Sequence, residues 1–255
     1  NLQDHLSIDS AFYCKKPVTL HTLTQPLKKL GVGLQWLATR SGVGASHIWE
    51  MGGFVFGNDQ VTHPNLQYHF TPVYSEWRDR KIHLEQGYVL TCDHLRPKSR
   101  GEIKLRSADP TDRPASHFNY LSHPDDTKEM IEGLNVMQDL LTQPVFDEFR
   151  GERISPAPQL QSHSELEAWV RAYSSTDYHP SGTCRMGQDE LAVVDEELRV
   201  RGIDQLRVVD ASIMPDIVSG NLNAPTQMIG ERAADYILGN PQLPPEKARF
   251  HFLES

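Results

Sequence analysis

The sequence predicts an α+β protein in which helices flank an antiparallel sheet, and two kinds of pattern support this. Several short segments alternate apolar and polar residues at every second position, which is typical of strands that bury one face. Longer segments repeat apolar residues at every third or fourth position, which is typical of amphipathic helices. Turn-forming residues separate neighbouring strand segments, so we expect those strands to run antiparallel. The helical segments are 27–40, 125–143, 162–175 and 224–239.

The first predicted strand lies at the start of the chain, where Leu6, Ile8 and Phe12 alternate with polar residues. Residues 27–40 follow, with leucines at helical spacing and internal glycines that weaken the helix. Residues 42–57 are punctuated by glycines and predict a loop that leads into another strand.

The centre of the predicted sheet lies between residues 60 and 110. Segments 65–74, 87–97 and 101–107 are predicted as strands, and the turn-forming sequence PKSRG joins the last two. Alternation assigns the side chains of the first segment to two faces, with Leu66, Tyr68 and Phe70 on one and Gln67 and His69 on the other.

Two helices are expected after the strands. Residues 125–143 begin with acidic residues and are followed by Pro144, which cannot continue a helix. Residues 162–175 carry the spacing of a capping box, for which we predict the pair Ser164 and Glu167.

The last predicted elements are a short strand and a helix. Residues 207–210 are β-branched and end in Asp210. The helix over 224–239 has Pro225 in its first turn and Gly239 as its stop.

Composition narrows the class of protein. The 255 residues carry a formal net charge of −9, which argues against a nucleic-acid partner. Three widely spaced cysteines without a CxxC pair predict neither a disulfide framework nor a metal site, and they favour a reducing compartment. We therefore expect an intracellular, cytoplasmic protein, with peripheral membrane association as the alternative.

A phosphate-binding GxGxxG loop is absent from the sequence. GVG occurs at 31–33 and 42–44, but neither copy completes the fingerprint or follows a buried strand. The opening NLQDHLSID has no initiator Met and starts within a structured pattern. We therefore expect the chain to be a fragment, either the C-terminal half of a longer protein or a processed piece of one.

His179 and Asn223 are the first candidates for chemistry, because each lies in a segment built from turn residues, YHPSGT and SGNLNAP. An imidazole and a carboxamide at one place can take a proton from an alcohol and hold the resulting alkoxide. The alternative is that His179 is a loop histidine bonded to the backbone and that Asn223 caps the helix that follows it.

The C-terminal segments resemble those of the glucose–methanol–choline oxidoreductases, and within that family the chain is most similar to the choline dehydrogenases. The specific matches lie at residues 178–187 and 206–235. The weaker ones, in the same order as in the family, are NLQDHL, GVGAS, EMGGF, PNLQYHF, RGEIKLRSADP, FNYLSHPDD and FRGERISP.

The resemblance implies a domain layout and a partner. It implies that the sheet belongs to a substrate domain and that the chain also carries the C-terminal part of a Rossmann-like FAD-binding domain. The missing N-terminal half would carry the GxGxxG loop. The expected segments are the end of an FAD-domain segment at 1–10, the substrate domain at 11–175, the FAD-binding and catalytic segment at 176–240, and an extended tail at 241–255.

The resemblance also implies residue roles around FAD. His179 matches the catalytic acid/base beside the flavin N5 atom, and Asn223 matches its partner. Asp210, Ala211 and Ser212 match a turn that approaches the ribityl–pyrophosphate chain, although Asp210 could instead only cap a turn. Residues expected near the pyrimidine edge of the flavin are Asn223, Ala224, Pro225 and Thr226, and Asn221 is also expected to bind the cofactor.

Trp49, His69 and Tyr178 resemble the substrate-site lining of choline-oxidising members. Aromatic faces attract a trimethylammonium group by about 0.5–2 kcal/mol per ring. The alternatives are core packing for the two aromatic residues and a solvent-facing position for His69. Ser7 stands where such relatives usually have an acidic residue after QDH, and Asp9, on the same strand face, is the candidate substitute.

The implied function is FAD-dependent oxidation of a small primary alcohol to an aldehyde, by proton abstraction and hydride transfer to flavin N5. A choline-like alcohol is one candidate substrate, and the electron acceptor would be a quinone, an electron carrier or dioxygen. Two alternatives remain open, an alcohol oxidase that uses dioxygen and a non-catalytic, flavin-free relative that binds a ligand.

Overall fold

The computed structural model describes residues 1–49, 51–157, 160 and 162–247. The strands are β1 (Leu6–Cys14), β2 (Met51–Val55), β3 (Leu66–Thr71), β4 (Tyr74–Arg78), β5 (Lys81–Glu85), β6 (Gly87–His94), β7 (Glu102–Lys104), β8 (Ala115–His117), β9 (Arg150–Ser155) and β10 (Ser175–Thr176). The helices are α1 (Pro26–Thr39), α2 (Pro124–Thr142), α3 (His163–Tyr173) and α4 (Asn223–Leu238), with 3₁₀ turns η1 (Leu20–Thr24), η2 (Val43–Ala45), η3 (Pro144–Phe146) and η4 (Ala211–Ile213).

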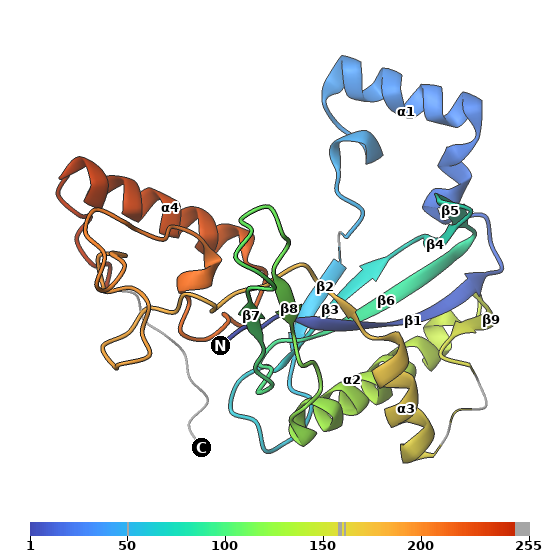
Figure 1. The fold of residues 1–255 in the computed structure, drawn as a ribbon. Helices are drawn as coiled ribbons and strands as arrows, with labels where there is room; N and C mark the ends of the chain where they lie inside the picture. Colours follow the sequence, from blue (N-terminus) through green and yellow to red (C-terminus); the bar gives the residue numbers. More distant parts are fainter. Residues whose placement is uncertain (50, 158–159, 161, 248–255) are drawn as a thin grey trace.

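An antiparallel sheet forms the centre of the molecule, with the strand order β10-β1-β6-β3-β2 and with β9 also paired to β1. Helices α2 and α3 cover one face of this sheet, while α1 stands away from it and α4 lies to one side (Figure 1). The α+β class and the antiparallel arrangement predicted from the sequence are confirmed. The sheet is wider than predicted, because it recruits the short strands β9 and β10 from the second half of the chain.

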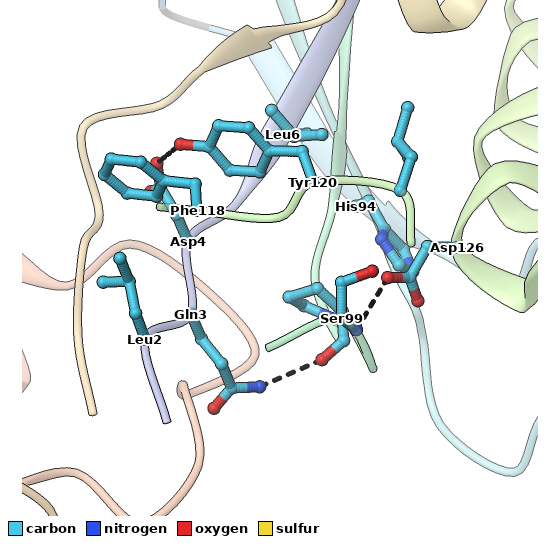
Figure 2. Close-up of a pocket in the computed structure, with 11 residues that line it drawn as sticks. Leu2, Gln3, Asp4, Leu6, His94, Ser99, Phe118, Tyr120 and Asp126 are labelled. Carbon is cyan, nitrogen blue, oxygen red and sulfur yellow. Dashed lines mark hydrogen bonds between the residues drawn. The ribbon is translucent and has the colours of Figure 1, made fainter. Parts of the chain in front are cut away.

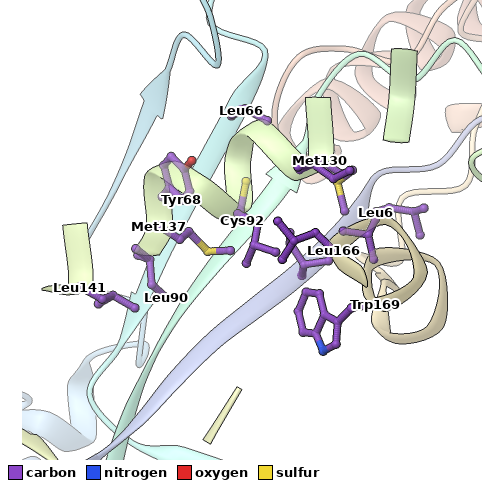
Figure 3. Packing of buried hydrophobic residues seen from close by; sticks show 14 of the residues in the cluster. Leu6, Leu66, Tyr68, Leu90, Cys92, Met130, Met137, Leu141, Leu166 and Trp169 are labelled. Atoms are coloured by element: carbon purple, nitrogen blue, oxygen red, sulfur yellow. The ribbon is translucent and has the colours of Figure 1, made fainter. Parts of the chain in front are cut away.

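The main hydrophobic core lies between the sheet and the two helices on its covered face. Alternate residues of the strands, such as Leu6, Leu66 and Cys92, point into this core, where they meet Met130 and Met137 of α2 (Figure 3). Because strand side chains alternate between faces, this apolar row requires every second residue of the same strands to point the other way.

The opposite face of these strands carries polar side chains that lie in register with one another. Ser7 of β1 lies opposite Asp93 of β6. One step along, Thr91 lies opposite Asp9 on one side and His69 on the other. Alternation therefore places three titratable side chains on one surface, with the core directly beneath them.

Residues 101–107 do not extend the main sheet, which corrects the prediction for that segment. Gly101 pairs with Leu2 through two backbone hydrogen bonds, and Glu102–Lys104 then forms a separate two-stranded sheet with β8. The reason is that β7 has no face to bury, since all three of its residues are exposed.

The four predicted helices are present, but the cap at the start of α3 differs from the prediction. The capping box of α3 is formed by Ser162 and Glu165, not by Ser164 and Glu167. The predicted pair is shifted by two residues because the helix begins at His163, so that Ser162 is the residue with an extended backbone. Helix α1 forms where predicted, but it contains no buried residue.

The C-terminal segment has a hydrophobic cluster of its own, in which Ile213, Leu222 and Ile229 are buried. The strand predicted over 207–210 is absent from it, and Arg207 makes only an isolated bridge to Arg199. Asp210 begins the turn η4 instead. Helix α4 ends at Gly239, whose φ of 70° lies in the left-handed region, as the predicted stop requires.

The chain beyond α4 has no helix or strand over residues 241–247, and the rest of the predicted tail, 248–255, lies outside the described residues. Among the helices of the described residues, none combines the length and the apolar character needed to cross a bilayer.

Gly133 provides a test of the packing between α2 and the sheet. A Cβ atom added at Gly133 would lie 2.6 Å from Cys92 Sγ and 3.3 Å from Leu66 Cδ1, both within the core. Overpacking of this kind costs about 1–3 kcal/mol. It outweighs the roughly 1 kcal/mol that alanine adds to helix propensity. We expect Gly133→Ala to lower the free energy of unfolding, measured with urea.

Gly33→Ala in α1 is the matched control, since nothing lies within 4 Å of a Cβ atom there. This variant is expected to leave the free energy of unfolding unchanged or higher. Equal effects of the two substitutions would contradict the packing described for α2.

Candidate active site

A cavity of about 670 Å³ opens on the polar face of the sheet. It brings together six of the residues predicted for the site, namely Ser7, Trp49, His69, Tyr178, His179 and Asn221. Seven further residues complete the lining, namely Asp9, His47, Thr91, Asp93, Ser175, Thr176 and Asp177. The sheet supplies one wall of the cavity and the loop that carries His179 supplies another.

The His179 loop is held by a buried carboxylate from the other end of the chain. The backbone N–H of His179 donates to Asp4 Oδ1 at 2.9 Å, and the Thr176 hydroxyl donates to Asp4 Oδ2 at 2.6 Å. Figure 2 shows a third bond, in which the Tyr120 hydroxyl donates to the same carboxylate. Asp4 is 3% exposed, so these three donors supply the hydrogen bonds that burial would otherwise remove.

Two backbone features shape this loop. Tyr178 has a φ of 61°, a left-handed conformation that costs a non-glycine residue about 1–3 kcal/mol. Gly182 has a φ of 80°, and a Cβ atom at that position would lie 2.5 Å from the backbone oxygen of Asn1. The glycine of YHPSGT therefore allows the loop to lie directly against the N-terminal segment.

His179 forms a pair with a second histidine, His5. The Nδ1 atoms of the two rings lie 3.0 Å apart, and the rings meet edge to face. The other ring nitrogen of His5, Nε2, lies 3.2 Å from the carbonyl oxygen of Leu95. Since a carbonyl can only accept, His5 Nε2 carries a hydrogen, and in the neutral ring Nδ1 then carries the lone pair.

The tautomer of His179 follows from that of His5. Because His5 Nδ1 accepts, His179 Nδ1 must donate, which leaves Nε2 of a neutral His179 with the lone pair. Burial, followed by the charge of His179, lowers the pKa of His5 to about 4. Burial also lowers the pKa of His179, against the opposing charges of Asp4 and Asp93. Both rings are therefore neutral at neutral pH, and His179 presents a base.

A group of carboxyl side chains lines the same cavity. Asp93 Oδ2 lies 2.7 Å from His69 Nε2, and this hydrogen bond raises the pKa of His69. Asp9 accepts from the Thr91 hydroxyl at 2.6 Å, while burial raises its pKa. Burial, and then the charge of Asp93, raise the pKa of Asp177 to about 8.

The positions of Trp49, Tyr178 and His69 exclude core packing for the two aromatic residues and a free, solvent-facing position for the histidine. Trp49 and Tyr178 are 52% and 85% exposed, so neither is an ordinary core residue. His69 is half-buried and bonded to Asp93, so it is not a free, solvent-facing sheet histidine. Ser7 lines the cavity as expected from its strand face.

The carboxamide that lines the cavity with His179 is that of Asn221, and Asn223 is not among the lining residues. Asn221 Oδ1 accepts from Gln67 Nε2 on the polar face of the sheet at 3.1 Å. Asn223 is the first residue of α4, and its side-chain oxygen accepts from Gln227 one turn along the helix. The predicted pairing of His179 with Asn223 therefore stays a prediction, with Asn221 as the asparagine that lines the cavity.

The residues predicted for the flavin lie at the start of α4 and at η4, where they could hold such a group. Helix α4 begins without a side-chain cap, so its first backbone N–H groups are available to an acceptor. Ala224 is exposed, and Pro225 and Thr226 are partly exposed, beside the cavity residue Asn221.

At η4 the side chain of Asp210 accepts a hydrogen bond from Ser212 N at 2.7 Å. Asp210 therefore caps this turn, which was the alternative to a contact with the flavin. Ala211 follows as the first residue of η4. The described residues contain no group of three or more His, Cys, Asp or Glu side chains that could hold a metal ion.

Sequence reasoning missed several residues of the site. His5, Asp4, Asp93 and Asp177 were not singled out, although Asp4 and His5 lie within the quoted NLQDHL. For Asp93 the signal was available, because it shares the strand parity of Thr91 in a segment predicted as a strand. Nothing in local spacing indicates that the ring of His5 meets His179, since 174 residues separate them.

Known proteins resemble this chain over nearly its whole length. It is 44% identical over 250 residues to the oxygen-dependent choline dehydrogenase of Escherichia coli O45:K1, and 44% identical over 251 residues to that of Klebsiella pneumoniae subsp. pneumoniae. Each alignment covers 98% of this chain but only 44–45% of the relative, so the chain spans less than half the length of these proteins.

Solved structures share the fold. A formate oxidase gives a TM-score of 0.84 at 26% identity, covering 94% of this chain and 47% of the oxidase. A related structure of this enzyme from Aspergillus oryzae RIB40 is described by its FAD modification. Pyridoxine 4-oxidase gives a TM-score of 0.75 at 24% identity over 95% of this chain and 44% of that enzyme, which bears on the fold alone.

A family model agrees with these relatives. The model described as GMC oxidoreductase matches residues 97–230, which is more than half of the chain. The matched range includes the His179 loop, both asparagines and the start of α4. The chain therefore belongs to the GMC oxidoreductase family.

Proposed function

We propose that the protein containing this chain oxidises a small primary alcohol to an aldehyde, with FAD as its cofactor. The observation that carries the proposal is the base at His179, whose lone pair is assigned to Nε2 by the contact with His5 and which lines a cavity large enough for a small alcohol. A further part of the polypeptide, with a phosphate-binding loop, would complete the FAD site. Family membership and the FAD named for formate oxidase support the cofactor.

Two residues that line the cavity and two that lie behind it have distinct tasks in this mechanism. His179 Nε2 accepts the hydroxyl proton, and the resulting imidazolium is stabilised by the nearby carboxylates of Asp4 and Asp93. The Asn221 amide donates to the alcohol oxygen as negative charge develops there. Asp4 holds the loop, and His5 keeps the tautomer.

The flavin would be held by the uncapped start of α4 and by the backbone around η4, and when bound it accepts the hydride from the alcohol carbon. The base must act first or together with this transfer, because a neutral alcohol is a poor hydride donor. A pKa of His179 below its ordinary value keeps the ring unprotonated and ready at neutral pH.

Dioxygen is the electron acceptor that the relatives favour, since the curated proteins are named oxygen-dependent choline dehydrogenases and a solved neighbour is a formate oxidase. A quinone or another electron carrier is the competing acceptor. Oxygen uptake during turnover, with and without an added quinone, distinguishes the two. A purified full-length protein that lacks the yellow colour of flavin would instead favour a non-catalytic relative.

The direct test of the proposed function is anaerobic mixing of the full-length, flavin-loaded protein with small primary alcohols. We expect loss of the oxidised flavin's visible absorption in a stopped-flow instrument, with aldehyde formed in equal amount. If no alcohol in a broad panel reduces the flavin, the proposed function is wrong.

Replacement of the base should abolish most of this reaction. We expect His179→Ala to slow flavin reduction by about 10²–10⁴-fold, because the proton no longer has an acceptor, while the flavin content stays unchanged. In the parent protein the rate should fall as the pH drops through the lowered pKa of His179 and stay level above it. His163→Ala, at the exposed start of α3, is the control and should leave the rate unchanged.

The two asparagines provide a matched pair of variants. Asn221→Ala removes the amide that lines the cavity, and we expect flavin reduction to slow by about 10²–10³-fold. Asn223→Ala removes only a bond to Gln227 within α4 and should slow flavin reduction far less. If Asn223→Ala slows flavin reduction more than Asn221→Ala, then Asn223 is the partner of His179, as predicted from the sequence.

His5 provides a test of the tautomer. In His5→Leu the acceptor for His179 Nδ1–H is lost, and we expect flavin reduction to slow by about tenfold. His5→Gln offers an amide oxygen as a replacement acceptor and should recover part of that loss. If His5→Gln is as slow as His5→Leu, His5 acts only by filling space.

A further inference from the structure

The carboxyls of Asp93 and Asp177 form a hydrogen-bonded pair at the wall of the cavity. Asp93 Oδ1 and Asp177 Oδ2 are buried, and no N–H group or hydroxyl of the described residues donates to either atom. An ionised carboxylate can only accept hydrogen bonds, so a bond between two carboxyls requires a proton on one of them. The pair therefore holds one proton that serves both side chains.

Contacts with the neighbouring residues assign this proton to Asp177. Asp93 Oδ2 lies 2.7 Å from His69 Nε2, and a hydrogen bond from an imidazole favours the ionised form of Asp93. Burial, and then the charge of Asp93, raise the pKa of Asp177 to about 8. At neutral pH Asp177 therefore donates and Asp93 accepts.

The other titratable groups near the pair do not replace this bond. Among them, His69 opposes the rise in the pKa of Asp177 through its charge, but its effect is smaller than those of burial and Asp93. No lysine or arginine is among the residues that line the cavity. The titratable groups packed around the pair are Asp4, His5, Asp9, His47, His69, Cys92, Tyr120 and His179.

The pair joins the rigid sheet to the loop that carries the base. Asp93 lies on β6, which is paired on both sides, with β1 and with β3. Asp177 lies two residues before His179, and between them Tyr178 has the left-handed φ of 61°. A strained residue keeps such a conformation only where the contacts around it hold it. The pair holds the loop before Tyr178, and the bond from His179 N to Asp4 holds it after Tyr178.

We propose that the proton shared by Asp93 and Asp177 clasps the His179 loop onto the sheet, so that the base keeps its position while the pair holds this proton and leaves it when the pair ionises. Asp177 is then a positioning residue, which acts through His179. The shared proton follows from the contacts, whereas its effect on the reaction rests on the proposed function.

Ionisation opens the clasp because the proton passes to water and leaves two buried carboxylates in contact. Their repulsion is relieved only when one of them moves away. Asp93 is fixed by the strands on either side of β6, so the loop is the part that moves. Release of the strain at Tyr178 favours the same movement.

Position 7 fits a pair that holds a single negative charge. Ser7 lies opposite Asp93 on β6 and opposite Ser175 on β10, two residues before Asp177. Choline-oxidising relatives are expected to carry an acid at this position, and such an acid would place a third carboxyl beside the pair. The neutral hydroxyl of Ser7 instead forms a hydrogen bond with Asp177.

The clasp adds an alkaline limb to the rate of flavin reduction. The base at His179 alone predicts a rate that stays level at high pH. With the clasp, the rate should fall as the pH rises through about 8, where Asp177 loses its proton. The level region therefore lies between the lowered pKa of His179 and about pH 8.

Three variants of the full-length, flavin-loaded protein test this limb by anaerobic flavin reduction with a saturating primary alcohol. In Asp177→Asn an amide N–H donates to Asp93 at every pH, so we expect a neutral-pH rate close to that of the parent and no alkaline decline. Asp177→Ala removes the clasp at every pH and should slow the reaction by about tenfold at neutral pH. Asp9→Asn is the control, because Asp9 is a cavity carboxyl bonded to Thr91, and it should keep the decline.

Two measurements follow the clasp without catalysis. The infrared carbonyl band of a protonated carboxyl should disappear from the parent as the pH rises through about 8, and this band should be missing from Asp177→Asn at neutral pH. Amide hydrogen exchange over residues 175–181 should be equal in the parent and Asp177→Asn below about pH 8. Above it, exchange should be faster in the parent.

A parent rate that stays level into alkaline solution, or a decline that persists in Asp177→Asn, would overturn the inference and leave the proposed function intact. Flavin content and thermal unfolding establish that each variant is folded, and the profile of the parent needs no variant. If no alcohol reduces the flavin, the proposed function is wrong, and the infrared band still decides whether the pair holds a proton. Its absence from the parent at neutral pH would contradict the clasp.

Discussion

The two-residue period of β-strands is the constraint on which the rest of the molecule depends. Strands β1, β3 and β6 must bury one row of side chains against α2, and this row fixes the register of all three. Because strand side chains alternate, the same register also directs the second row of side chains toward the cavity. A slip by one residue in β6 would exchange Cys92 with Asp93, which would place a carboxylate in the core and a thiol in the site.

A hydrogen-bond network joins residues near the start of the sequence to the loop that carries His179. Asp4 holds the backbone of the His179 loop, and His5 holds its ring. Neither residue lines the cavity, yet Asp4 fixes the position of the His179 loop and His5 fixes the tautomer of the His179 ring. The geometry of a base thus depends on buried groups behind it as much as on the cavity in front.

The sequence was sufficient for those features that local pattern controls. The alternation of Leu66 and Tyr68 with Gln67 and His69 predicted both faces of β3, and helical spacing predicted the later helices. Two local predictions failed, the capping box at Ser164 and the strand at 207–210, and another prediction failed because a distant contact overrides local pattern. Residues 101–107 leave the main sheet because Gly101 pairs with Leu2. The pairing of His179 with Asn223 stays a prediction, since Asn223 lies at the start of α4 and outside the lining of the cavity. The contact between His5 and His179 joins two loops that no local period connects.

That histidine contact spans 174 residues, and its length affects how the protein matures. Closing so large a segment is slow compared with forming a helix or a hairpin, since the entropy of the intervening chain must be overcome first. The helices and hairpins of the intervening segment can therefore form before the rings of His5 and His179 meet. The pairing of the two imidazoles, and with it the tautomer of His179, thus requires that the whole intervening segment is folded.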